Sequence, residues 1–231
     1  MKNYNDGTVK NLEEIENPEQ AIHDFAEGSE ALEDLLKFCY ENGIKTKACC
    51  RGHEKDFSHP YILFEDTALN YLSNLEEVVA VIDAEITYTP KISASWPARC
   101  GVHCKHNNPE SSDLFFKNIK GILEYTIEQN EIHLPKSFEL VDRINDNINR
   151  SFFLSGKIAP HIQKNIKGTD QYTYTLTTPW AAIANGKDST TLSHELEEID
   201  NNRINPCQMT LDINGLSRYA EKIEQLFSKK K

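Results

Sequence analysis

The feature that most constrains the fold is an amphipathic helix pattern that passes directly into two short β-strand patterns. Ser29 suits the N-cap of a helix, and Gly43 suits the C′ position at which a helix ends. Residues 44–50 and 61–64 then show the β-branched, alternating composition of strands. The helix between the two caps has one apolar face made of Leu32, Leu35, Leu36 and Cys39. This succession predicts an α/β or α+β fold in which helices pack on the faces of a mixed sheet.

The rest of the chain continues this mixture of patterns. Helical spacing recurs at 67–82, 112–129, 137–150 and 215–227. Strand alternation recurs at 86–89, 92–103, 171–178 and 207–213. Residues 62–72 also align without gaps on residues 209–219, and both read as strand, acidic turn and helix. That internal likeness indicates two related α/β units.

The domain organisation follows from these patterns. We expect a loose lead-in at 1–15, where the sequence is polar and unpatterned. An α/β unit with the Cys/His clusters is expected at 16–130, and a second α/β unit packed on the first at 131–231. A single compact domain is the alternative.

Length, composition and charge limit the classes of function. The chain has 231 residues, of which 39% are hydrophobic and 26% charged, as in ordinary globular proteins. No apolar run approaches the roughly 18 residues of a membrane-spanning helix, and the first residues lack a signal-peptide pattern. The formal net charge of −11 disfavours nucleic acid as a partner. We therefore expect a cytoplasmic, acidic protein without membrane contact; its oligomeric state stays open.

Two short segments concentrate the residues that can bind metals. The six cysteines and eight histidines make fourteen such residues, and seven of them lie within 49–53 and 100–106. Sulfur and imidazole are ligands that Zn²⁺ prefers, which predicts a zinc site. Because Cys49 and Cys50 are adjacent, they point to opposite faces of a regular strand, and one of them can join His53. The candidate ligands are Cys50, His53, Cys100, His103, Cys104 and His106.

Two other interpretations of the first cluster stay open. Cys49 or Cys50 could be a catalytic nucleophile, with His53, His59 or His103 as its base. Alternatively, the cysteine is a buried strand residue and His53 a loop residue bound to backbone, since free cysteine is among the most buried residue types.

The common nucleotide-binding and hydrolase motifs are absent from the sequence. There is no Walker loop, GxGxxG, GxSxG or EF-hand pattern. The function expected from sequence is therefore that of an accessory protein that binds a small ligand, a metal or a protein partner at the Cys-Gly-His loop. A cysteine-dependent enzyme with acyl or nucleotide-directed chemistry is the alternative.

One segment resembles known proteins. The pattern G-x-x-T-x-x-C-C-x-G-H over 43–53, followed by Y-I-x-F over 61–64, resembles small bacterial and phage proteins of unestablished activity. The resemblance covers about residues 29–72 and implies a shared α/β unit with a Cys-Gly-His loop. A looser resemblance is to the third wybutosine-synthesising enzyme, a tRNA methyltransferase family with a Ser-Cys-x-Gly-Arg turn after a strand. His53 replaces that arginine here.

Overall fold

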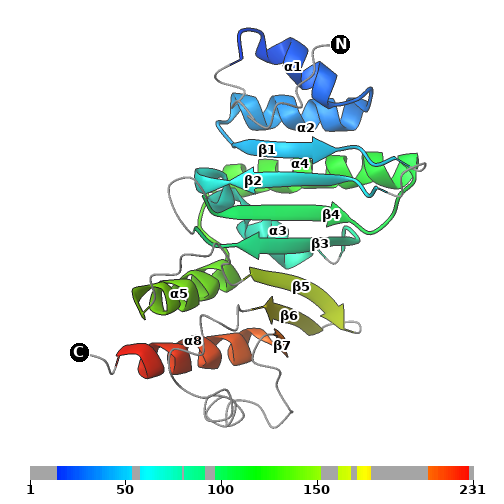
Figure 1. The fold of residues 1–231 in the computed structure, drawn as a ribbon. Coiled ribbons are helices and arrows are strands. Elements are labelled where there is room, and N and C mark those ends of the chain that lie inside the picture. The colour runs from blue at the N-terminus through cyan, green and yellow to red at the C-terminus, as the bar shows by residue number, and fades with distance from the viewer. Residues whose placement is uncertain are drawn as a thin grey trace. The chain divides into compact units, whose positions relative to one another are not determined.

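The computed structural model describes residues 15–53, 58–79, 81–91, 97–151, 161–167, 171–177 and 208–228 (Figure 1). Outside these ranges lies the expected lead-in, apart from residue 15. Parts of three expected strands also lie outside them: residues 92–96 of 92–103, residue 178 of 171–178 and residue 207 of 207–213. The chain divides into two compact units. One runs to Glu85 and resumes at Cys100–Leu134, and the other comprises Ile86–Arg99 and Pro135–Lys231. Most of strand β3 (Ala84–Thr89) falls in the second unit, where it pairs with another strand.

The first unit combines helices with neighbouring strands. Its strands are β1 (Thr46–Cys50), β2 (Tyr61–Glu65) and β4 (Arg99–Cys104), which are hydrogen-bonded in the order β1-β2-β4. Strand β1 runs antiparallel to β2, with Cys50 opposite Tyr61. Its helices are α1 (Pro18–Phe25), α2 (Glu30–Glu41), the 3₁₀ helix η3 (Asp66–Leu72), α3 (Ser73–Val78) and α4 (Pro109–Glu128).

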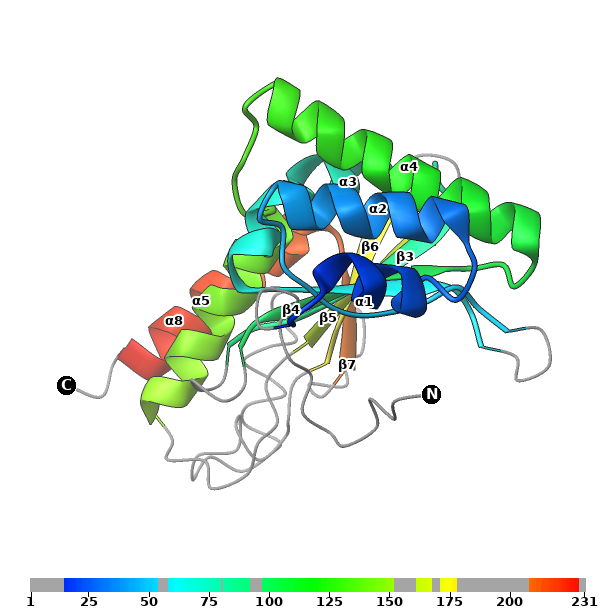
Figure 2. The ribbon, with the colours of Figure 1, turned by 90° about the horizontal axis from the view of Figure 1, so that it is seen from above.

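Helices α2 and α4 lie side by side over one face of these strands (Figure 2). The alternation of β2 directs Ile62 and Phe64 into the core, where both are fully buried. The predicted apolar face of α2 is buried as expected, and α4 adds Phe115, Phe116, Ile119 and Leu123. The core of this unit therefore lies between the helix pair and the strands.

The local signals at α2 are confirmed, whereas the expected helix at 67–82 is only partly right. The Ser29 hydroxyl accepts a hydrogen bond from the Leu32 N–H, and Gly43 has a φ of +67° just beyond the helix. The segment after β2 forms η3 and then the short helix α3. Its apolar residues Leu69, Leu72 and Leu75 recur every three residues, a spacing that a 3₁₀ helix satisfies as well as an α-helix.

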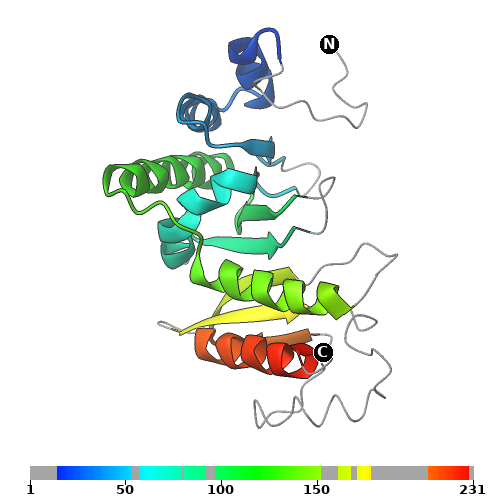
Figure 3. The same cartoon turned by 90° about the vertical axis from the view of Figure 1, so that its left-hand side faces the viewer.

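The second unit contains a four-stranded antiparallel sheet. Its order is β3 (Ala84–Thr89), β5 (His161–Lys167), β6 (Gln171–Thr177) and β7 (Gln208–Leu211). Helices α5 (Lys136–Ser151) and α8 (Ile213–Ser228) pack against each other (Figure 3). The Arg143 guanidinium donates two hydrogen bonds, of 3.1 and 2.8 Å, to the Glu224 carboxylate across this helix pair. The ring of Tyr88 stacks on Phe138 at 4.0 Å.

The structure belongs to the α+β class, which is one of the two classes expected from sequence. The two segments that align in the sequence share the order of strand and helix, although the first helix is 3₁₀ and the second is α. Among the described helices, none has both the length and the apolar character needed to cross a bilayer.

Candidate metal centre

The loop after β1 turns back sharply at Gly52. This residue has a φ of +85°, and a Cβ at its position would lie 2.8 Å from Cδ of Pro60. Only glycine adopts this conformation without strain and without contact with that ring. The turn directs His53 back toward Cys50, the last residue of β1, and His53 and Ser58 exchange backbone hydrogen bonds of 3.0 and 3.3 Å. The turn therefore brings together a sulfur and an imidazole from the same short segment.

Two side chains near the start of α4 hold the same loop from the other side. The Ser112 hydroxyl donates to the Arg51 carbonyl at 2.7 Å, and Nδ2 of Asn107 donates to the His53 carbonyl at 3.2 Å. Ser112 is buried, so its hydrogen bond is shielded from water. The backbone on both sides of Gly52 is thus fixed by α4.

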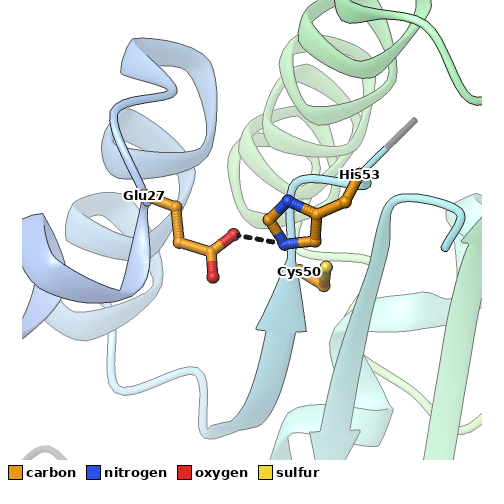
Figure 4. Close-up of side chains that lie close together, drawn as sticks. All are labelled: Glu27, Cys50 and His53. Carbon is orange, nitrogen blue, oxygen red and sulfur yellow. Dashed lines mark ion pairs between the residues drawn. The ribbon is translucent and has the colours of Figure 1, made fainter. Parts of the chain in front are cut away.

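Glu27 joins this loop from the turn between α1 and α2. Its φ is +53° and that of Gly28 is +83°, so two successive left-handed residues link the helices. For a residue with a Cβ, this conformation costs about 1–2 kcal/mol. Oε2 of Glu27 lies 3.1 Å from Nε2 of His53 (Figure 4). A strained residue whose side chain reaches a Cys/His pair marks a candidate functional position.

Glu27, Cys50 and His53 each offer one ligand atom, and these atoms all lie within 4.8 Å of one another. Figure 4 shows the Glu27 carboxylate paired with Nε2 of the imidazole and the Cys50 side chain beside the same ring. Nitrogen and oxygen ligands of a tetrahedral Zn²⁺ stand about 3.4 Å apart, given metal–ligand bonds of about 2.1 Å. The spacing of the three atoms is therefore close to that of a metal site, and the group could hold a metal ion.

The surroundings of the sulfur also suit a metal ligand. The Gly52 N–H donates a hydrogen bond to Sγ of Cys50 at 3.3 Å. Such donors from the surrounding backbone orient a thiolate and offset part of its charge. One thiolate, one carboxylate and one neutral imidazole carry two negative charges, which balance a divalent cation. The ligand group is partly exposed, so an ion can reach it from solvent.

The adjacent Cys49 lies in a different environment. Its thiol donates to the Phe25 carbonyl at 3.9 Å. Burial, together with the nearby charges of Glu27 and Cys50, raises the pKa of the Cys49 thiol to about 12. Of the two cysteines proposed as nucleophile, Cys50 is therefore the one placed beside His53.

The second Cys/His segment lies on β4 and the turn after it, and β2 separates β4 from β1. Neighbouring strands are about 4.8 Å apart, so two steps across the sheet exceed the span of one metal site. Within the described ranges, the Glu27, Cys50 and His53 group is the one set of three or more such side chains at ligand distance. The structure therefore does not bring the four ligands predicted on 100–106 to the first cluster.

Those four side chains have other environments. Cys100 and Cys104 are buried in β4, and burial raises the pKa of both thiols. The His103 ring lies 5.9 Å from the Tyr61 ring, and burial lowers the pKa of His103. His106 is paired with Asp83.

A polar cleft of about 690 Å³ adjoins the candidate metal centre. It is bordered by the turn before α2, by the loop after β1 and by the start of α4. Its lining includes Ser29, Arg51, His53, Asn107, Ser112 and Asp113. Because His53 belongs to both, the cleft and the metal centre share one wall.

Sequence reasoning identified Cys50 and His53 but missed Glu27. The chain has 36 acidic residues, and nothing in the sequence distinguishes this one from the others. The weak signal that existed was the Glu-Gly pair between two helices, where a tight turn is required.

Comparisons with models of protein families, with curated proteins and with solved structures found no match to this chain.

Proposed function

We propose that this protein binds a divalent transition-metal ion, with Zn²⁺ as the first candidate, through Glu27, Cys50 and His53. The observation that carries the proposal is the convergence of carboxylate, thiol and imidazole within 4.8 Å of one another. The hydrogen bond from Gly52 to the Cys50 sulfur and the anchoring of the loop by α4 support it, because both hold the ligands in place without the metal.

Three protein ligands leave one position of a tetrahedral ion open. Structural zinc sites close all four positions with protein side chains, whereas reactive sites keep one for water or substrate. The proposed centre belongs to the second type, so the protein would bind a small ligand through its metal. A reducing compartment keeps a cysteine thiol available for a metal, and a cytoplasmic location is therefore part of the proposal.

Metal analysis of the full chain, purified without chelator, tests this proposal together with Co²⁺ titration of the metal-free protein. We expect about one equivalent of metal and a thiolate-to-Co²⁺ charge-transfer absorption. Cys50→Ser should lower the affinity by at least about 100-fold, because it removes the one thiolate ligand. Cys49→Ser is the matched control, since its thiol faces the Phe25 carbonyl, and it should bind metal as the wild type does. Equal binding by both variants, or no metal in the wild type, would contradict the proposal.

A cysteine-dependent enzyme is the second candidate, and one observation favours it. Cys50 has an imidazole within reach and a backbone donor on its sulfur, as an activated nucleophile requires. In a relay, however, the acid and the thiol use opposite nitrogens of the imidazole. Here the carboxylate pairs with Nε2 of His53 and all three ligand atoms lie within 4.8 Å of one another, an arrangement that supports the metal centre more directly. Rapid alkylation of Cys50 in wild-type protein that binds no metal would reverse this preference.

A further inference from the structure

Arg51 is a cationic residue of the cleft, and its side chain is accessible to a ligand. The residue is exposed and lines the cleft together with Gly28, His53 and Asp113. Its Nη1 lies 4.0 Å from the position that a Cβ of Gly28 would occupy, so the guanidinium lies beside the turn that precedes α2. Among the described residues, no carboxylate lies within 4.0 Å of it.

Most other polar groups of the cleft wall are already engaged in the protein's own hydrogen bonds. Ser112 binds the Arg51 carbonyl, and Asn107 binds the His53 carbonyl. The Ser29 hydroxyl donates to Asp113 at 3.0 Å, and Oδ1 of Asn108 accepts from the Ser111 N–H at 2.9 Å. These bonds fix the shape of the wall, and the Arg51 guanidinium is the permanently charged donor among the described lining residues.

The charges around the cleft are mixed. Glu30 and Asp113 also line it and oppose an anion. One oxygen of Asp113 is held by Ser29, and Glu30 lies in the first turn of α2, where the helix dipole offsets its charge. Helix α4 also begins at this cleft, with Asn108 as its N-cap. The two negative charges of the proposed ligands neutralise a divalent ion. The cationic residue closest to those ligands along the chain is then Arg51, which directly follows Cys50.

We propose that the cleft binds a small ligand with an oxyanion group, a carboxylate or a phosphate, which pairs with Arg51 while another of its atoms binds the metal. This proposal rests on the proposed metal centre. A planar guanidinium fork matches the two oxygens of a carboxylate or phosphate. Arg51 and His53 stand on either side of Gly52 and line the same cleft, so one small molecule can reach both.

Titration of the Co²⁺-loaded full chain with acetate, and separately with inorganic phosphate, tests the proposal. The d–d absorption of Co²⁺ reports an added ligand directly. We expect one of the two anions to alter the wild-type spectrum in a saturable way, and the more effective anion identifies the oxyanion class. Arg51→Gln should weaken this binding by about tenfold or more, since it removes a charge-assisted hydrogen bond. Arg51→Lys keeps the positive charge but not the planar guanidinium. Its affinity for the anion should lie between those of the wild type and Arg51→Gln.

Matched variants separate a specific effect from a general change of charge. Lys37→Gln removes a positive charge about 10 Å along α2 from Glu30 and should leave anion binding unchanged. Glu30→Gln removes an opposing charge from the cleft and should strengthen anion binding. If Co²⁺ binds but neither anion alters its spectrum, or Arg51→Gln responds as the wild type does, this inference is wrong and the metal centre stands. If Co²⁺ does not bind, both proposals are wrong.

Discussion

Gly52 lies against the ring of Pro60 so closely that a Cβ on Gly52 would approach Cδ of Pro60 to 2.8 Å. Its φ of +85° adds a second restriction, because residues with a Cβ rarely adopt that conformation. Proline and glycine therefore fix the turn that carries His53 to Cys50.

We expect Gly52→Ala to lower the free energy of unfolding by about 2–4 kcal/mol, from backbone strain and overpacking together. Urea denaturation measures this change. Gly43→Ala is the control, since Gly43 has a similar φ of +67° but nothing within 4 Å of an added Cβ. Its cost should be about 1 kcal/mol, from the backbone alone. Similar losses in the two variants would show that the contact with Pro60 is unimportant.

We expect the left-handed backbone of Glu27 to lower the stability of the fold, while its carboxylate contributes to the metal centre. Glu27→Gly relieves the left-handed strain and Glu27→Gln keeps it, while both remove the carboxylate. The glycine variant should therefore be more stable than the glutamine variant by about 0.5–1 kcal/mol, as thermal denaturation can measure. Both variants should bind Co²⁺ more weakly than the wild type. Unchanged metal affinity in both would remove Glu27 from the ligand set.

The two neighbouring cysteines should differ in their response to pH. Because burial raises the pKa of Cys49 to about 12, its thiolate is scarce at neutral pH. Its alkylation rate, followed by peptide mass spectrometry, should rise about tenfold per pH unit through pH 10 without a plateau. Glu27→Gln should accelerate the reaction modestly, because the Glu27 charge also raises this pKa. A plateau near pH 8 or 9 would contradict the burial of this thiol.

Asp142 should make the protein less stable as pH rises. Burial, with the charges of Asp146 and Glu139, raises the pKa of Asp142 to about 6, although the Tyr88 hydroxyl donates to its carboxylate at 2.7 Å. The folded protein thus holds a proton that the unfolded chain releases near its ordinary pKa of 3.8. Asp142 therefore contributes its full stability below pH 4 and loses it as pH rises through about 6.

Asp142→Asn tests this expectation, because an amide oxygen can still accept the hydrogen bond from Tyr88. The variant should be more stable than the wild type at pH 8 by about 1 kcal/mol, a value reduced for the partial exposure of the side chain. The difference should vanish near pH 4, as chemical denaturation at both values can show. Asp146→Asn, which removes only a neighbouring charge, should show a smaller effect. A constant difference across this range would assign the effect to packing.

Local signals predicted the helices better than they predicted the strands. The caps of α2 depend on neighbouring residues, so Ser29 and Gly43 could be assigned directly. Strand β5 was missed, because its place comes from pairing with β3 and β6, which lie far from it in the sequence. The spacing of Leu69, Leu72 and Leu75 did not separate a 3₁₀ helix from an α-helix, since both present such residues on one face.

The sequence by itself determined the Cys50-Gly52-His53 turn, because a strand end, a glycine and a histidine within four residues are a local arrangement. Alternation along β1 also determined that only one of the two adjacent cysteines could join it. The tertiary structure decided the rest of the site. It placed β2 between this turn and the second Cys/His segment, and it brought Glu27 to His53 from another turn of the chain. Sheet order and helix packing are set by contacts between distant residues, and the local pattern of a sequence does not encode them.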